Sequence, residues 1–541
     1  MQGNQPIYIL KEGTEREKET AQENNILAGR AIAEAVKTTL GPKGMDKMLV
    51  NSMGDIIITN DGATILKEID VEHPAAKMVI EVSESQDQEC GDGTTTVVVL
   101  TGELLKQAQD LIDKKIHPTI INKGYSIASK EAIKKLNEIA VDVNGKGTRD
   151  ILYNIAMTSM ASKGASSDKE HLANLIVDAL LQIKNEDGKV DLDDIHLVKV
   201  DGASINNTEL VNGMIISKER SDESMPSEIK GAKVLLLNYE LDTKKTSVES
   251  KINISSPDQL QKYLDQEEGM LKDMVDKVYK SGANVVFCQK GIDEVVLGML
   301  ARKGIYAIRR VQKNDMKKLS KALNTKIVSN LEDILSTKLG KAEKVMEDNI
   351  NKVKITRIKG CINPKAVTIL LRGSTQQVLE ELNRALHDAL SVVKVAIEDG
   401  KIIPGGGAYN IELAKHLRQF APTIGGREQM AIESYADALE VIPKVLAENA
   451  GMDAIDVLID MKQIHSGKRG LYWGLNVNTS DIENMLDSHI IEPLRLLSHE
   501  IETSTEAATM ILRIDDVIAS KQMEMPPQSG PSPGMPPNPY M

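Results

Sequence analysis

The sequence predicts a multidomain protein in which two mainly helical terminal regions enclose an α/β middle. With 541 residues the chain is too long for one hydrophobic core, so roughly two to four domains are expected. Apolar residues recur at helical spacing near both ends of the chain. Between them, short apolar runs alternate with helical patterns, which is typical of βαβ units and a parallel sheet.

The N-terminal region is expected to be mainly helical up to about residue 145. Thr14 and Glu17 have the spacing of a capping box and predict a helix that runs to about Leu40 and stops at a Gly-Pro pair. The segment "MLVNSMGDIIITND" predicts a tight hairpin. A short helix should follow "NDG", and a longer one should span about 94–114.

Four apolar runs predict strands in the middle region, at about 215–365: "KVLLLNYEL", "ANVVFCQKG", "GIYAIRRV" and "TKIVSN". Beyond them, "AVTILLRGS" predicts another strand, followed by a long helix from about Thr375 to Glu398. The chain after "PGGGAYN" is expected to be helical again. The Pro-rich tail at about 523–541 cannot form a packed core and is expected to be disordered.

One predicted helix is long beside its neighbours. Ser256 and Gln259 form a capping box with Pro257 at the first helical position, and the pattern continues to Lys280, or roughly 36 Å. An apolar stripe runs along it, made of Leu260, Leu264, Leu271, Met274 and Val278. The helix could pack on the sheet along its whole length, or it could project and bury this stripe against another molecule. Periodicity alone favours packing on the sheet.

Composition and charge exclude several classes of protein. The net charge of −13 argues against a nucleic-acid binder, because such a protein needs a basic surface. No apolar run approaches the length of a membrane span, and the N-terminus lacks the features of a signal peptide. The three cysteines are far apart in sequence, so a disulfide framework or zinc site is not expected. We therefore expect a cytoplasmic protein without a membrane partner.

The most informative chemistry lies in "CGDGTTTVVVL". Asp92 stands between Gly91 and Gly93, where the backbone can approach a ligand closely. Three threonines, Thr94, Thr95 and Thr96, then open a helix, whose free N–H groups suit phosphate. Asp92 could offer oxygen to Mg²⁺. Taken alone, however, a glycine turn with a capping aspartate is the commoner explanation of such a segment.

Other segments combine glycine with charged residues. They are "TTLGPKGMDKML", "TNDGAT" with Asp61, and "IPGGGAYN". Asp388 lies about 200° round its helix from Leu386, away from the apolar stripe of that helix, so it could be solvated or could face a cleft. The chain has no GxxxxGK[ST] or HExxH motif, and no GxSxG segment marks a nucleophilic serine, which argues against the common nucleotide loop and two hydrolase signatures.

Together these motifs closely resemble those of group II chaperonins. The resemblance rests on "TTLGPKGMDKML", "NDGATILKEIDVEHPAAKM", "GDGTTTVVVLTGELL", "VVFCQKGID", "IEDGKIIPGGGA" and "LRIDDVI", and covers about residues 7–521 in order. It implies an ATP-dependent molecular chaperone that uses ATP/ADP and Mg²⁺. It also implies partners: identical or paralogous subunits in stacked rings of eight or nine, and unfolded client proteins.

The resemblance further implies three domains. An equatorial ATPase domain would comprise about 1–147 and 400–541, and a hinge-like intermediate domain about 148–214 and 366–399. An apical client-binding domain would comprise about 215–365, with a helical protrusion at about 245–280 that serves as a built-in lid.

The site residues are also implied by the resemblance. Asp61 and Asp388 would position and activate the hydrolytic water, and Asp92 would bind Mg²⁺. The residues implied to bind nucleotide are Gly41, Pro42, Gly91, Gly93, Thr94, Thr95, Thr96, Lys163, Gly406, Gly407, Asn476 and Glu492. Two rival functions remain open: a metabolic ATPase or kinase that acts on a small molecule, and a scaffold or holdase without useful turnover.

Overall fold

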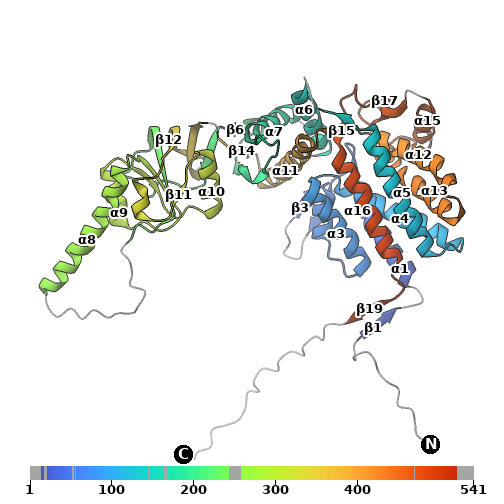
Figure 1. The fold of residues 1–541 in the computed structure, drawn as a ribbon, viewed down its shortest axis with the longest axis horizontal. Coiled ribbons are helices and arrows are strands. Elements are labelled where there is room, and N and C mark those ends of the chain that lie inside the picture. Colours follow the sequence, from blue (N-terminus) through green and yellow to red (C-terminus); the bar gives the residue numbers. More distant parts are fainter. Residues whose placement is uncertain are drawn as a thin grey trace, which may run out of the picture.

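A computed structural model describes residues 14–17, 21–50, 54, 56–143, 147–163, 168–242, 257–351, 353–362, 364–467 and 470–520. The chain folds into an elongated molecule with three parts (Figure 1). We call them the helical body (residues 14–143 and 401–520), the middle body (147–211 and 364–400) and the sheet body (213–362). Separate clusters of buried apolar side chains fill the three parts, so each has its own core.

The helical body joins the two ends of the chain in one core. Its helices are α1 (Ala21–Lys37), α2 (Gly62–Glu68), α3 (Pro74–Cys90), α4 (Thr94–Asp113), α5 (Pro118–Ile139), α12 (Ala408–Ile424), α13 (Gly426–Leu439), α14 (Val441–Asn449), α15 (Ala454–Ser466) and α16 (Leu494–Leu512). Helix α4 lies at the centre and is buried along most of its length, against α1, α13 and α16. Tyr125 and Tyr435 meet edge to face in this core, with 5.4 Å between ring centroids. The predicted helices after "NDG" and from Thr94 are confirmed.

Short strands complete the helical body. The predicted hairpin is confirmed as the antiparallel pair β2 (Lys47–Val50) and β3 (Ile56–Thr59). The C-terminal region is less purely helical than expected, because it also contains short strands. These are β15 (Lys401–Pro404), which pairs with β4 (Val141–Asp142) and β18 (Ile491–Pro493), and the hairpin of β16 (Trp473–Asn476) and β17 (Asp481–Asn484).

The capping-box prediction at Thr14 and Glu17 is wrong. These residues form strand β1 (Thr14–Glu17), which pairs antiparallel with β19 (Val517–Ser520), and the first helix begins only at Ala21. The pairing partner comes from the other end of the chain, about 500 positions away. A local spacing rule cannot detect such a partner, and the backbone hydrogen bonds it supplies override the local helix signal.

The middle body places helices against a small sheet. Its helices are α6 (Thr148–Ser159), α7 (Lys169–Ile183) and α11 (Gln376–Asp399), and its strands run in the order β5 (Ile195–Asp201), β14 (Val367–Gly373), β6 (Glu209–Val211). The predicted strand "AVTILLRGS" and the long helix after it are thereby confirmed. Thr375 caps α11, since its side chain accepts a hydrogen bond from the Val378 N–H.

The sheet body contains the predicted parallel sheet. Strands β8 (Glu228–Leu237), β9 (Val285–Cys288), β10 (Tyr306–Ile308) and β11 (Ile327–Val328) pair in parallel, with α9 (Glu294–Arg302) and α10 (Lys313–Ala322) in the connections. An antiparallel half was not predicted. It is formed by β12 (Gly340–Ile350), β13 (Val353–Cys361) and β7 (Gly213–Ile216). Strands β12 and β13 carry many charged residues and so lack the apolar runs that marked the parallel strands, whereas the missed strand β7 is apolar but only four residues long.

Helix α8 (Pro257–Lys280) is the long amphipathic helix expected from the sequence. One half of it packs on the sheet body and the other half projects. Leu271, Met274 and Val278, in its C-terminal half, are buried against the sheet body. Leu264, one to two turns earlier, is 49% exposed, and the helix projects away from the body at its N-terminal end (Figure 1). Packing therefore explains one half of the stripe only. The proposed capping residue Ser256 lies outside the described residues.

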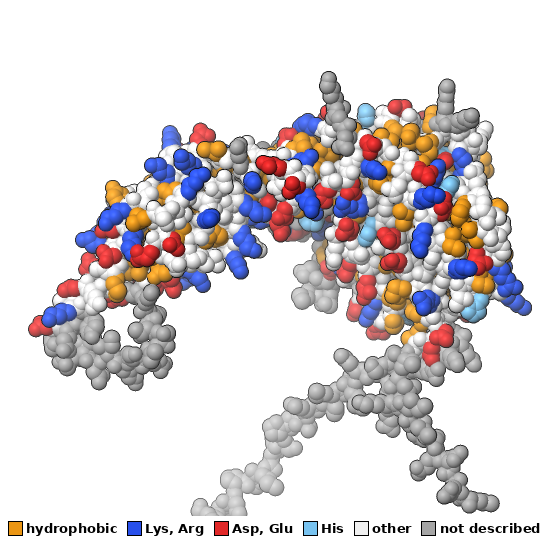
Figure 2. Space-filling view, viewed as in Figure 1, with side chains coloured by type: hydrophobic (Ala, Val, Ile, Leu, Met, Phe, Trp, Pro, Cys, Tyr) orange, Lys and Arg blue, Asp and Glu red, His pale blue; other side chains and the backbone are white. Residues whose placement is uncertain are grey.

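The distribution of surface charge and the state of the cysteines can be compared with what the composition predicted. On the face drawn in Figure 2, side chains of both charges are interspersed over all three bodies. Cys90, Cys288 and Cys361 are buried and unpaired, as expected. Within the described part of the chain, no helix combines the length and apolar character needed to cross a membrane.

Candidate functional site

A cavity of about 410 Å³ lies where the helical body meets α6 of the middle body. Most of the residues singled out from sequence line it: Gly41, Pro42, Asp61, Asp92, Gly93, Thr94, Thr95, Thr96, Lys163, Gly406, Gly407, Asn476 and Glu492. Gly91 and Asp388 do not line the cavity. Gly91 packs behind it against Ser391, and Asp388 contacts it through an ion pair with Lys163. Segments far apart in sequence thus converge on one pocket.

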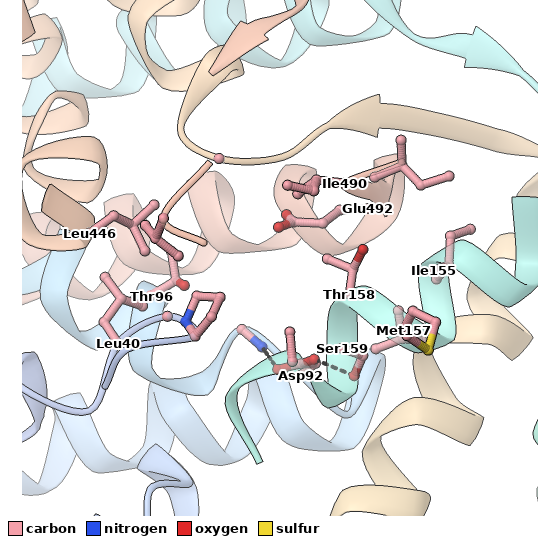
Figure 3. Close-up of a pocket in the computed structure, with 18 of the residues that line it drawn as sticks. Leu40, Asp92, Thr96, Ile155, Met157, Thr158, Ser159, Leu446, Ile490 and Glu492 are labelled. Atoms are coloured by element: carbon pink, nitrogen blue, oxygen red, sulfur yellow. Dashed lines mark hydrogen bonds between the residues drawn. The ribbon is translucent and has the colours of Figure 1, made fainter. Parts of the chain in front are cut away.

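Asp92 occupies a tight turn between two helices. Helix α3 ends at Cys90 and α4 begins at Thr94, and both flanking glycines have positive φ, +73° at Gly91 and +78° at Gly93. The Asp92 carboxylate accepts hydrogen bonds from the Gly93 N–H, at 2.8 Å, and from the Ser159 hydroxyl, at 2.6 Å (Figure 3). The second bond joins the helical body to the end of α6.

The N-terminus of α4 opens onto the same cavity. Thr94, Thr95 and Thr96 all line it. Gly93, the residue before the helix, provides no side-chain cap, so the first N–H groups have no partner from a cap. Free N–H groups and the positive end of the helix dipole together favour an anion such as phosphate. Beside them, the oxygens of Asp92 are the ligand type that Mg²⁺ prefers, so these residues fit a magnesium–phosphate group.

Asp61 is held in its ionised form. One carboxylate oxygen accepts hydrogen bonds from the Thr64 N–H and hydroxyl, at 2.8 and 2.6 Å, and the other from the Thr94 hydroxyl, at 3.0 Å. Burial alone would raise the pKa of Asp61, but Lys163 and these hydrogen bonds together hold it below its ordinary value. Asp61 also caps α2, so its position is set by local structure.

Lys163 and Asp388 form a buried ion pair within the middle body. Burial alone would lower the pKa of Lys163, but Asp388, Asp92 and Asp61 raise it, so the lysine stays protonated. Burial raises the pKa of Asp388 to about 8 against the attraction of Lys163, and the negative charges of Asp61 and Asp92 add to the rise. The alternative that Asp388 is simply solvated is therefore wrong, because its residue is only 7% exposed.

The opposite wall combines glycines with Glu492, while a further carboxylate, Glu500, lies beside Gly93 of the turn. Gly406 and Gly407 both have positive φ and approach β16 and α14 closely. Burial raises the pKa of Glu492 to about 7, with a further contribution from Asp92. Burial and the nearby Glu492 also raise the pKa of Glu500 well above its ordinary value. Glu492 and Glu500 thus favour their neutral form at or below neutral pH.

Sequence reasoning missed one side of the cavity. Helix α6 contributes Tyr153, Ile155, Met157, Thr158 and Ser159, and further apolar contacts come from Leu40, Leu446 and Ile490 (Figure 3). These residues carry no glycine-rich or acidic signature. The hydroxyls of "AMTSMASK", immediately before Lys163, are the one local signal that could have indicated Ser159.

Comparison with known proteins identifies the class of protein. Residues 32–522 match the model of the TCP-1/cpn60 chaperonin family, and the chain belongs to this family. Members of the family are ATPases that act as chaperones in protein folding, so this chain is an ATP-dependent chaperonin subunit.

The chain is similar to individual archaeal thermosome subunits over nearly its whole length. The chain is 51% identical over 524 residues to a thermosome subunit of Methanothermococcus thermolithotrophicus, covering 97% of this chain and 96% of the relative. It is also 51% identical to the thermosome subunit beta of Archaeoglobus fulgidus, with 98% of each chain covered. The thermosome subunit alpha of Thermoplasma acidophilum is 51% identical over 541 residues, which cover 99% of this chain and 98% of the relative. The resemblance to group II chaperonins is confirmed over nearly the whole chain.

Proposed function

We propose that the cavity binds Mg²⁺ together with ATP or ADP. Asp92 would hold the metal, Gly93 and Thr94 to Thr96 would hold the phosphates, and Gly41 and Pro42 would close over them. Gly91, which lies behind the cavity, would shape the turn that carries Asp92. Gly406, Gly407, Glu492 and Asn476 would lie beside the nucleoside. The support is the placement of the free α4 N-terminus and the Asp92 carboxylate on the same cavity. Bound Mg²⁺ would supply neutralisation of phosphate charge.

Asp388 would accept a proton from the attacking water. A general base works best when its pKa lies near the operating pH, and burial raises the pKa of Asp388 into that range. Asp61, whose pKa is lowered, stays ionised and would orient the water without taking its proton. Lys163 would stabilise the ionised form of Asp388 and, because it also lies 4.0 Å from Asp92, would respond to charge at the phosphate end.

One observation carries this proposal. Two carboxylates from the helical body, Asp61 and Asp92, lie close enough to Asp388 of the middle body for their charges to raise its pKa. Movement of the middle body would therefore assemble or separate the catalytic groups, which would couple hydrolysis to conformational change. We propose the corresponding domains: an equatorial domain at 1–147 and 400–541, an intermediate domain at 148–214 and 366–399, and an apical domain at 215–365.

We further propose that the subunits form stacked rings of eight or nine in the cytoplasm, around a cavity for unfolded client proteins. The projecting N-terminal half of α8 supports a role as a lid, because its Leu264 is exposed in the single chain. Clients would bind on α8 and on the apical helices α9 and α10.

The test is ATP-dependent refolding by the purified chain. We expect Mg²⁺-dependent ATP hydrolysis, ring-shaped particles in negative stain, and recovery of a denatured client that requires ATP. Refolding that proceeds equally well without ATP would favour a holdase. A particle the size of one chain that phosphorylates or hydrolyses a small molecule would favour a metabolic enzyme.

A further inference from the structure

The Asp92 turn is supported from behind by a buried amide that the proposed mechanism does not use. Gln86 lies on α3, one turn before the helix ends, and its residue is 0% exposed. Its side-chain Nε2 donates hydrogen bonds to the backbone carbonyl of Asp92, at 3.1 Å, and to that of Leu496 on α16, at 3.3 Å. The turn and α16 are thereby tied to the same amide group.

Gln86 contacts the turn on both sides of Asp92. Its backbone carbonyl accepts from the Gly91 N–H, at 3.3 Å, while its side chain holds the Asp92 carbonyl. Gly93 closes the arrangement, since a Cβ there would lie 3.0 Å from the Gln86 Nε2 and 2.2 Å from Glu500 Oε1. The backbone on either side of the carboxylate is therefore fixed by packing and hydrogen bonds.

A histidine sets the orientation of this amide. His499 of α16 lies with Nδ1 2.6 Å from the Gln86 Oε1. The amide nitrogen faces two carbonyl oxygens, which can only accept, so the nitrogen and oxygen of Gln86 cannot be exchanged. The oxygen must then accept from His499, whose Nδ1 carries a hydrogen. Every strong hydrogen-bonding atom of the amide thus has a role in this arrangement.

We propose that Gln86, oriented by His499, is a positioning residue for Asp92. It fixes the peptide that carries the Asp92 carboxylate and so keeps that carboxylate turned toward the cavity. The inference rests on the proposed function, because the consequence of misplacing Asp92 is weaker binding of Mg²⁺ with nucleotide. Groups that orient a metal ligand in this way typically change metal affinity by about 10- to 100-fold when they are removed.

The test is calorimetric titration of ADP into the full-length protein, once with Mg²⁺ and once with EDTA. The ratio of the two affinities gives the gain that Mg²⁺ provides, and this gain does not depend on turnover. For Gln86→Met, which keeps the length but removes the hydrogen bonds, we expect the gain to fall about tenfold, while binding in EDTA stays within about twofold. For His499→Ala we expect the same direction and a smaller fall, about threefold, because only the orientation of the amide is lost.

Asn122→Leu is the matched control. Asn122 is another buried amide that donates to an α16 carbonyl, that of Thr509 at 3.2 Å, but it lies on α5, away from the turn. Its loss should lower the thermal stability and leave the Mg²⁺ gain unchanged. The proposal is overturned if Gln86→Met and His499→Ala both keep the full Mg²⁺ gain in ADP affinity. It is also overturned if Asn122→Leu lowers this gain as much as they do. If Gln86→Met does not fold, His499→Ala decides alone. A wild-type protein without any Mg²⁺ gain would instead refute the proposed function, and this inference with it.

Discussion

The two halves of the candidate site hold their carboxylates in opposite ways. In the helical body, Asp61 and Asp92 sit at helix starts and accept hydrogen bonds from nearby N–H and hydroxyl groups. In the middle body, Asp388 is buried in the middle of α11 and the one bond to its carboxylate comes from Lys163, as far as the described residues show. The pKa of Asp61 is lowered, whereas that of Asp388 is raised.

This difference shows that proximity in space does not give two carboxylates the same chemistry. Hydrogen bonds to the charged form lower a pKa, and burial without enough of them raises it. Asp61 is thereby suited to hold charge, and Asp388 to exchange a proton. Four sets of variants would break or sharpen this comparison.

The largest effect is expected for Asp388→Asn. The substitution keeps the size of the side chain but removes the proton acceptor, so ATP turnover should fall by about 10²- to 10⁴-fold while ADP binding is retained. Steady-state hydrolysis assays and calorimetry measure the two quantities. Glu380→Gln, at a partly exposed position of the same helix where the carboxylate pairs with Lys199, is the control and should leave turnover unchanged. Full activity of Asp388→Asn would show that Asp388 is not the proton acceptor, and the proposed difference in role between Asp61 and Asp388 would then be wrong.

The pH profile of turnover tests the same residue. A general base acts in its ionised form, and the pKa of Asp388 is raised to about 8. Turnover should therefore rise with pH up to about 8 and level off above it. A rate that is flat between pH 6 and pH 9 would contradict the role of Asp388 as the base.

Lys163→Met should lower the free energy of unfolding by about 3 kcal/mol at pH 8, because it leaves a buried carboxylate without its cation. The loss should become smaller as the pH falls below about 8, since Asp388 can then become neutral by protonation. The double variant with Asp388→Asn should recover most of the stability. Urea unfolding of the wild type, the two single variants and the double variant measures the coupling energy between Lys163 and Asp388. Additive losses of stability would show that the two residues are not coupled.

Glu492→Gln extends the comparison to the opposite wall. The pKa of Glu492 is raised to about 7 in the folded state, above its unfolded value, so the folded protein binds the proton more tightly. Its contribution to stability is full at acid pH and is lost as pH rises from about 4.5 to about 7. The neutral glutamine should remove this loss and stabilise the protein at pH 8 by roughly 3 kcal/mol. Thermal unfolding across pH measures it, and an unchanged pH dependence would contradict the assignment.

The smallest effect is expected for Asp61, where two substitutions separate the cap from the charge. Asp61→Ala removes the cap of α2 and should cost about 1 kcal/mol of stability. Asp61→Asn keeps an oxygen that can accept from the Thr64 N–H, so it should cost less than Asp61→Ala. Equal losses in chemical denaturation would mean that the charge, and not the cap, stabilises this half of the site.

Much of the fold could be predicted because its signals are local. The hairpin of β2 and β3, the helix that opens at Thr94 and the parallel strands of the sheet body all follow from spacing and apolar runs. The strand at Thr14–Glu17 could not be predicted, because its hydrogen-bonding partner lies at the other end of the chain. The charged strands β12 and β13 were missed for a related reason, since long-range pairing stabilises them in place of an apolar run.

The sequence by itself determined which groups are available for chemistry and where helices would present them. The glycines around Asp92 and the threonines after it specify a turn and a free helix start through backbone conformation alone. The tertiary structure decided which of these groups are charged and what holds them. Ser159 and Lys163 reach the carboxylates of Asp92 and Asp388 from distant segments. Because a pKa depends on burial and on partners from all of these segments, no local pattern could show that Asp61 stays ionised while Asp388 can hold a proton.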